Sequence, residues 1–162
     1  MNILTSMTSK KELDFKVMEQ AFNKVLERKE LEADWYCVNV NCKDRLVNGL
    51  IHFASREAMD IDGLGEAIVE QLLDNGLVSD VADIYYLTYD QVKGLDKFKE
   101  KSSKNLIDAI NESKKNSLDK LIFGLGIRHI GKKAAKVLAE HVDTIYDFTH
   151  MTSEDLYKID EV

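Results

Sequence analysis

Apolar side chains recur at helical spacing along most of the chain. In residues 10–31 polar residues separate Leu13, Val17, Met18, Ala21, Phe22 and Val25, a pattern typical of an amphipathic helix. From Arg45 onward, short apolar-periodic stretches are separated by brief breaks. Asp74-Asn75-Gly76 resembles a helix end, whereas Thr88-Tyr89-Asp90 and Ser153-Glu154-Asp155 resemble helix starts. The chain contains no proline, so no ring interrupts these helices, and we predict an all-α fold.

A five-residue pattern recurs three times at nearly equal intervals. It reads Ile-Asp-Gly-Leu-Gly at 61–65, Leu-Asp-Lys-Phe-Lys at 95–99 and Ile-Arg-His-Ile-Gly at 127–131, and it begins again at Ile159. Each copy precedes small and apolar residues at helical spacing, such as Ala134 and Ala135 after the third. The pattern is typical of helix–hairpin–helix repeats. We expect up to four such units, the last one truncated at Val162.

Such hairpins suit the binding of a phosphate backbone. Glycine lets the main chain approach a ligand closely, and the helix start behind it offers unpaired N–H groups and the positive end of a dipole. The third copy combines a glycine, Gly131, with four nearby cations, so we expect it to be the principal DNA contact. Its candidate DNA-binding residues are Gly126, Ile127, Arg128, His129, Ile130, Gly131, Lys132, Lys133 and Lys136.

The other two copies differ from the third in charge and in glycine content. Lys97 and Lys99 replace both glycines in the second copy, where Lys101 and Lys104 are further DNA-binding candidates. The first copy contributes Gly63 and Gly65 as candidates. Four carboxylates surround these glycines, at Asp60, Asp62, Glu66 and Glu70, so we expect this copy to be mainly structural. His129 is expected to pack or to bond the backbone rather than to act as a catalyst.

The net charge of −7 does not favour a polyanionic partner, but the charge is unevenly distributed. Residues 97–136 hold 11 basic and 4 acidic side chains, which can create a local positive field; a solvated helix face is the alternative explanation. Hydrophobic content of 44% suits a folded protein. There is no membrane-spanning stretch and no evident export signal, so a cytoplasmic protein is expected.

Cys37 and Cys42 form a C-x4-C pair, which is half of a tetrahedral zinc site. The sequence offers no second cysteine pair, and its four histidines have no ligand spacing to this one. Zinc is therefore a candidate metal, but stable binding by this chain alone is not expected, because two ligands lack the affinity of four. The alternative is a pair of reduced cysteines in an incomplete finger.

Three segments resemble the NAD-dependent bacterial DNA ligases: ADWYCVNVNC at 33–42, LIHFASREAMDIDGLG at 50–65 and LGIRHIG at 125–131. The similarity runs from about Leu31 to Val162. It implies a fragment with the second half of the zinc finger and the helix–hairpin–helix domain. The expected function is to hold nicked double-stranded DNA during replication and repair, together with the rest of a ligase polypeptide.

The resemblance also implies what the chain does not do. The family's Lys-x-Asp-Gly adenylation motif and its oligonucleotide-binding fold are absent, so we expect no catalysis by this chain alone. NAD and magnesium are the cofactors of the parent ligase, and none is expected here. The alternatives are a protein-interaction scaffold derived from a decayed ligase fragment, which would use Val17 and Phe22, and a base-excision glycosylase, for which the chain is too short.

These expectations divide the chain into three parts. Residues 1–31 form an N-terminal amphipathic helix, residues 32–53 form a partial zinc-finger-like unit, and residues 54–162 form the helix–hairpin–helix DNA-binding domain.

Overall fold

The computed structural model describes residues 26–27, 36–37, 39 and 42–159, which belong to two compact units, Met1–Arg45 and Leu46–Val162. In the first unit, β1 (Leu26–Glu27) pairs antiparallel with β2 (Tyr36–Cys37), with Leu26 opposite Cys37 and Glu27 opposite Tyr36. The predicted helix over residues 10–31 is therefore wrong at Leu26–Glu27, whose backbone pairs with a strand instead. The rest of that helix lies outside the described residues.

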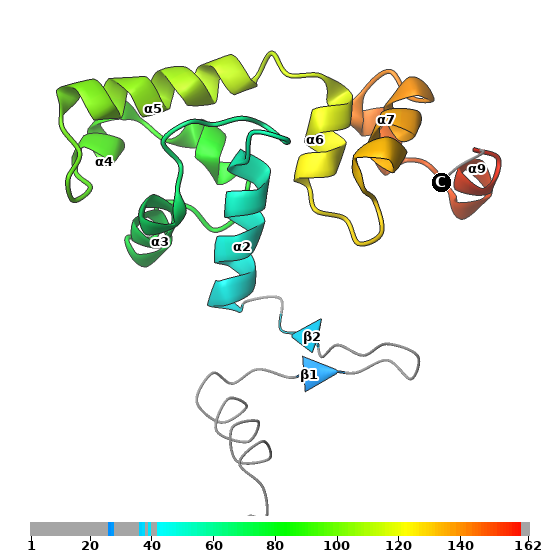
Figure 1. Cartoon of the computed structure of the whole chain (residues 1–162), viewed down its shortest axis with the longest axis horizontal. Helices are drawn as coiled ribbons and strands as arrows, with labels where there is room; N and C mark the ends of the chain where they lie inside the picture. The colour runs from blue at the N-terminus through cyan, green and yellow to red at the C-terminus, as the bar shows by residue number, and fades with distance from the viewer. Residues whose placement is uncertain (1–25, 28–35, 38, 40–41, 160–162) are drawn as a thin grey trace, which may run out of the picture. The chain divides into compact units, whose positions relative to one another are not determined.

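The second unit is helical, as predicted, and Figure 1 shows the order of its elements. The first helix, α2, begins at the boundary between the units. The elements are α2 (Lys43–Ala54), α3 (Glu66–Asp74), the 3-10 turn η2 (Asp83–Tyr86), α4 (Tyr89–Lys93), α5 (Glu100–Ser113), α6 (Leu118–Gly124), α7 (Lys132–Glu140), α8 (Ile145–Thr149) and α9 (Ser153–Tyr157). Among the described residues, no helix is both long enough and apolar enough to cross a membrane.

Local sequence signals set several helix ends. Thr88 caps α4: its hydroxyl accepts the Gln91 amide at 3.4 Å, and the Gln91 side chain accepts the Thr88 amide at 2.9 Å. Helix α3 ends before Gly76, which takes the left-handed φ of 64° expected of a glycine after a helix. The helix start predicted near Ser153 is also confirmed, with Thr152 as its N-cap.

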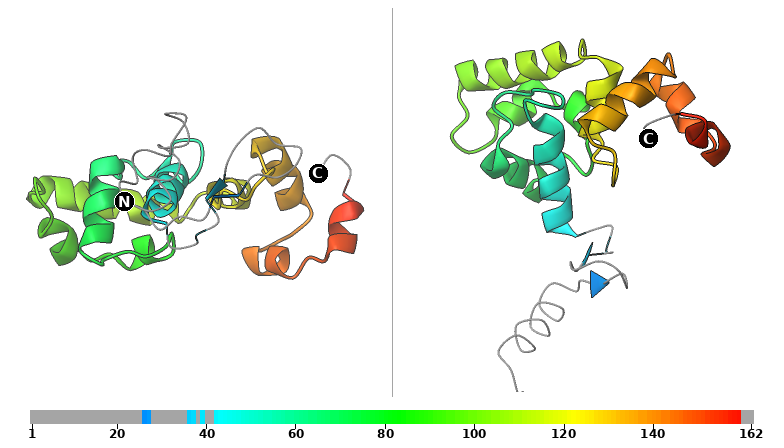
Figure 2. Two further views of the ribbon diagram at one scale, coloured as in Figure 1. Left: turned by 90° about the horizontal axis from the view of Figure 1, so that it is seen from below. Right: turned by 45° about the vertical axis from the view of Figure 1, so that its right-hand side comes forward.

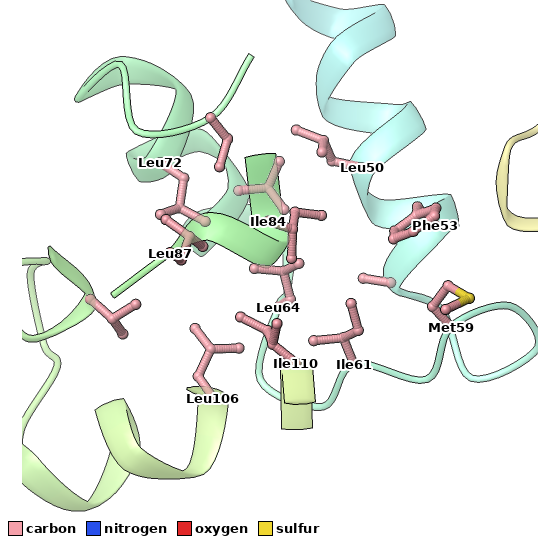
Figure 3. Packing of buried hydrophobic residues seen from close by; sticks show 14 of the residues in the cluster. Leu50, Phe53, Met59, Ile61, Leu64, Leu72, Ile84, Leu87, Leu106 and Ile110 are labelled. Atoms are coloured by element: carbon pink, nitrogen blue, oxygen red, sulfur yellow. The ribbon is translucent and has the colours of Figure 1, made fainter. Parts of the chain in front are cut away.

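The larger hydrophobic core fills the space between α2, α3, η2 and α5. Figure 3 shows Leu50 and Phe53 of α2 facing Ile84 of η2 and residues of the first repeat. Leu64, the apolar residue between the two glycines of that repeat, is itself buried in this core. The first repeat is therefore anchored by its own side chain, which fixes the orientation of the loop around it.

A smaller core joins α6 to the elements that follow it. Ile122, Ala135 and Leu138 are fully buried there, and Ile159 is nearly so. Helices α6 and α7 lie side by side in both views of Figure 2, and the small side chain of Ala135 is in the interface that they share. This pairing positions the third repeat, because residues 125–131 connect the two helices.

Candidate nucleic-acid interface

Three hairpin loops of the second unit share the same turn hydrogen bond. We call residues 61–65 the first hairpin, 95–99 the second and 127–131 the third. In each, the amide of the fourth residue donates to the carbonyl oxygen of the first. The pairs are Leu64 to Ile61 at 3.4 Å, Phe98 to Leu95 at 3.2 Å and Ile130 to Ile127 at 3.0 Å. The sequence repeat is therefore also a structural repeat.

The third residue of every hairpin has a left-handed backbone. Its φ is 86° at Gly63, 67° at Lys97 and 68° at His129. Only glycine adopts this region without steric cost, so Lys97 and His129 are strained there by about 1–2 kcal/mol each. Because the loop keeps its turn despite this strain, the missing glycines of the second hairpin do not change its geometry.

The fifth residue of each hairpin begins a helix in the same way. Gly65, Lys99 and Gly131 are all extended N-caps whose carbonyl oxygens accept the amide four residues later, at 2.9–3.0 Å. At Lys99 the backbone amide is already bonded to the Ser102 hydroxyl at 2.8 Å. No side chain caps the helix start at Gly65 or Gly131. These two starts thus keep the feature that suits an anion.

The third hairpin presents its backbone to solvent. Gly131 is exposed, and a Cβ built on it meets nothing within 4 Å. Ile127 is 39% exposed, whereas its counterparts Ile61 and Leu95 are only 3% and 5% exposed. Ile130 packs against the smaller core and anchors the loop to it. The loop is therefore anchored through the Ile130 side chain, while its backbone at Gly131 remains exposed to solvent.

Gly126 lies at the end of α6, directly before the third hairpin. Its φ is 63°, and its amide bonds the Phe123 carbonyl oxygen at 3.1 Å, so it ends α6. His52 of α2 donates through Nε2 to the same carbonyl oxygen at 2.9 Å and lies edge-on to the Phe123 ring. The geometry makes Gly126 a helix terminator beside the hairpin, and the sequence contains no local signal for the contact with His52.

The basic candidates lie on α5, on α7 and in the third hairpin. Lys132, Lys133 and Lys136 are exposed on α7, directly behind the third hairpin, and Arg128 is exposed within it. Lys132 already has a partner: its Nζ lies 2.5 Å from Oε1 of Glu57 and 5.9 Å from the centre of the Phe123 ring. Lys101 and Lys104 are exposed on α5 behind the second hairpin, so the candidates do not form one cluster in sequence or structure.

Carboxylates surround the first hairpin, as its sequence indicates. Asp60, Asp62, Glu66 and Glu70 are all exposed on or beside the loop that contains Gly63 and Gly65. Its backbone has the same form as that of the third hairpin, but its electrostatic environment has the opposite sign. The expectation of a mainly structural first hairpin remains a prediction.

Residues from distant parts of the sequence join the third hairpin. Arg56 and Glu57 follow α2, and Lys120 lies on α6, yet all three line one hollow together with Lys132 and Lys136. Sequence reasoning had a partial signal only for Lys120, which lies in the basic stretch 97–136. The position of Glu57 beside Lys132 depends on tertiary packing.

The cysteine pair falls at the edge of the described residues. Cys37 is in β2, but its side chain is outside what the structure describes, whereas Cys42 is buried just before α2. The Cys42 amide donates to the Asn39 carbonyl oxygen at 3.2 Å. Within the described ranges, no three His, Cys, Asp or Glu residues lie together as a metal site would require.

Comparison with known proteins agrees with this geometry. A family model described as a helix-hairpin-helix motif matches residues 120–162, and one described as a SAM-like helix-hairpin-helix tandem matches residues 55–112. The first match includes the third hairpin, and the second match includes the other two.

Curated relatives are similar over most of the chain. A protein named DNA ligase from Anoxybacillus flavithermus is 50% identical over 137 residues, which are 85% of this chain and 20% of the relative. The DNA ligase of Staphylococcus saprophyticus matches equally well, and that of Bacillus licheniformis is 45% identical over 99% of this chain. The chain spans about a fifth to a quarter of the length of these relatives. The chain is thus similar to a segment of bacterial DNA ligases, and it contains matches to two helix–hairpin–helix models of its own.

Proposed function

We propose that this chain is the DNA-binding segment of a bacterial NAD-dependent DNA ligase. It holds the backbone of nicked duplex DNA while other parts of such a ligase perform the chemistry. The third hairpin and the start of α7 provide the main contact, with a further contribution from Lys101 and Lys104. The segment recognises phosphates rather than bases, because its contacts come from main-chain amides and flexible cations.

One observation carries this proposal: three loops with different sequences adopt one backbone geometry, and the third combines flanking cations with an uncapped, exposed helix start. The similarity to DNA ligases supports this function over the interaction scaffold, whose predicted residues Val17 and Phe22 lie outside the described part of the chain.

In this proposal, the cofactors of the reaction act in other parts of the complete ligase. NAD would supply the adenylyl group and magnesium would assist its transfer in the complete ligase. This chain's own residues would bind and orient the DNA. We expect no transfer of AMP from NAD to this chain, and mass spectrometry after incubation with NAD and magnesium checks this. A mass gain of one AMP would contradict it.

Titration of fluorescent duplex DNA at two salt concentrations tests the binding function. If about three phosphates are neutralised, affinity falls roughly 40-fold between 50 and 200 mM salt. Nicked and intact duplexes are compared, and we expect the nicked one to bind more tightly because it bends more easily. Lys133→Gln should weaken binding. Lys115→Gln is the control, because Lys115 pairs with Glu112 and is not among the candidate DNA-binding residues. No measurable DNA binding at 50 mM salt would refute the proposal.

A matched pair of glycine substitutions tests whether main-chain approach matters. Gly65 and Gly131 have nearly the same backbone, with φ of −84° and −83°, and an added Cβ meets nothing within 4 Å at either position. Alanine at either site should therefore leave stability almost unchanged. Gly131→Ala should weaken DNA binding about tenfold, because its methyl group keeps the phosphate from the amides. Gly65→Ala should have little effect; equal losses would contradict the ranking of the two hairpins.

A further inference from the structure

We infer that the hollow between the loop after α2 and the α6–α7 pair is a second phosphate site, which Glu57 occupies until DNA binds. Its charged lining consists of Arg56, Glu57, Asp119, Lys120, Lys132 and Lys136. The site rests on the proposed function, since its ligand is a phosphate of the same DNA. It adds Arg56 and Lys120 to the DNA-binding residues and gives Glu57 a competitive role.

The hollow is large enough for a phosphate group, and separate parts of the fold contribute its cations. Its volume is about 600 Å³, and the Phe123 ring forms part of its apolar wall. Three separate parts of the fold contribute cations: the loop after α2 provides Arg56, α6 provides Lys120 and α7 provides Lys132 and Lys136. Cations that converge from several elements can surround one phosphate, whereas those along a single helix face point to different ones.

Glu57 stands in this hollow as an anion would. Its carboxylate contacts the Lys132 ammonium at 2.5 Å, while the Phe123 ring lies 5.9 Å from the same nitrogen. Both partners are more than half exposed, at 63% for Glu57 and 54% for Lys132, so solvent weakens the pair. A DNA phosphate can therefore displace Glu57 at small cost, and Lys132 then exchanges one anionic oxygen for another.

The balance of charges favours this exchange. With Glu57 in place, the hollow has four cations and two carboxylates, the second being Asp119 on α6. When Glu57 turns away, four cations face Asp119 alone, and a phosphate restores the missing negative charge. Lys120 has a weak amide partner, Asn116 Oδ1 at 3.5 Å, which does not compete with a phosphate.

Fluorescence anisotropy with the whole chain and nicked duplex DNA tests this site. Arg56→Gln and Lys120→Gln should each weaken binding about five- to tenfold at 0.1 M salt and lower the salt slope by about one. Glu57→Gln should strengthen binding about two- to fivefold, the equivalent of one exposed ion pair. In a Lys132→Gln background, this gain should disappear, because the competing pair no longer exists.

Glu112→Gln is the matched control for Glu57→Gln. It removes the same charge from another exposed ion pair, that of Glu112 and Lys115 at 2.6 Å, which is not part of the hollow. An equal gain in both variants would overturn the inference, since it would reflect total charge alone. Unchanged binding in Arg56→Gln and Lys120→Gln would overturn it as well. If the unaltered chain binds no DNA, the proposed function itself fails, which is a distinct result.

Discussion

Replacing Gly63 by alanine tests the physical basis of the hairpin repeat. The φ of Gly63 is 86°, a value that costs an L-residue about 1–2 kcal/mol. Alanine also restricts the unfolded chain, which offsets about 0.4–1 kcal/mol of this cost. The added Cβ would lie 3.8 Å from Cδ1 of Leu106, an ordinary contact that adds no clash. The free energy of unfolding should therefore fall by about 1 kcal/mol, from backbone strain alone.

Gly49 provides the control for this substitution. It lies within α2, has an ordinary helical backbone, and a Cβ built on it meets nothing within 4 Å. Alanine there should raise the free energy of unfolding by about 0.5–1 kcal/mol, because glycine is a poor helix former. The same change, glycine to alanine, is thus expected to lower the free energy of unfolding at Gly63 and to raise it at Gly49.

Urea denaturation at 25 °C, followed by circular dichroism, measures both changes from the unfolding midpoint. A Gly63→Ala variant as stable as the unaltered chain, or more stable, would refute the reasoning. It would mean that the left-handed backbone at the third hairpin position is not a requirement of the fold. The reasoning would also be refuted if Gly63→Ala and Gly49→Ala changed the free energy of unfolding in the same direction.

Three further predictions concern backbone strain, close packing and pH. Lys97→Gly should raise the free energy of unfolding by about 0.5 kcal/mol, because it removes the strain of φ 67°; a loss in urea denaturation would contradict this. Gly124→Ala should lower it by about 1–2 kcal/mol, because the new Cβ would lie 3.2 Å from Phe53 Cδ2 and 3.3 Å from Ala58 Cβ; an unchanged thermal midpoint would argue against this. The pKa of Asp155 is held below its ordinary value of 3.8. The larger cause is the hydrogen bond from the Thr152 hydroxyl, and the smaller one is the hydrogen bond from the Thr152 backbone amide. Its cap on α9 is therefore fully formed above about pH 3.8 and is lost as the pH falls through the lowered pKa. In an NMR titration, Thr152→Ala should return that pKa toward 3.8, and a pKa unaffected by the substitution would contradict the assignment.

Much of the fold follows from short-range features of the sequence. Helix caps such as Thr88 and terminators such as Gly76 act within a few residues of themselves, so their effect can be read from the sequence directly. The hairpin repeat was recognisable for the same reason, since its turn involves only neighbouring residues. Leu26 and Glu27 show the limit of this approach, because a helical pattern of apolar residues was overridden there by pairing with Tyr36 and Cys37.

The electrostatic environment of the third hairpin depends on residues that only the tertiary fold brings together. From the sequence, Lys132 was a predicted phosphate contact because it stands at a helix start beside Gly131. Its pairing with Glu57 arises because α7 packs on α6 beside the loop that follows α2. Gly124 lets α6 approach α2 and the loop after it closely, since any side chain there would meet Phe53 and Ala58. Local backbone preferences are encoded within a few residues, whereas the partner of a charged side chain is decided by which distant segments the core holds together.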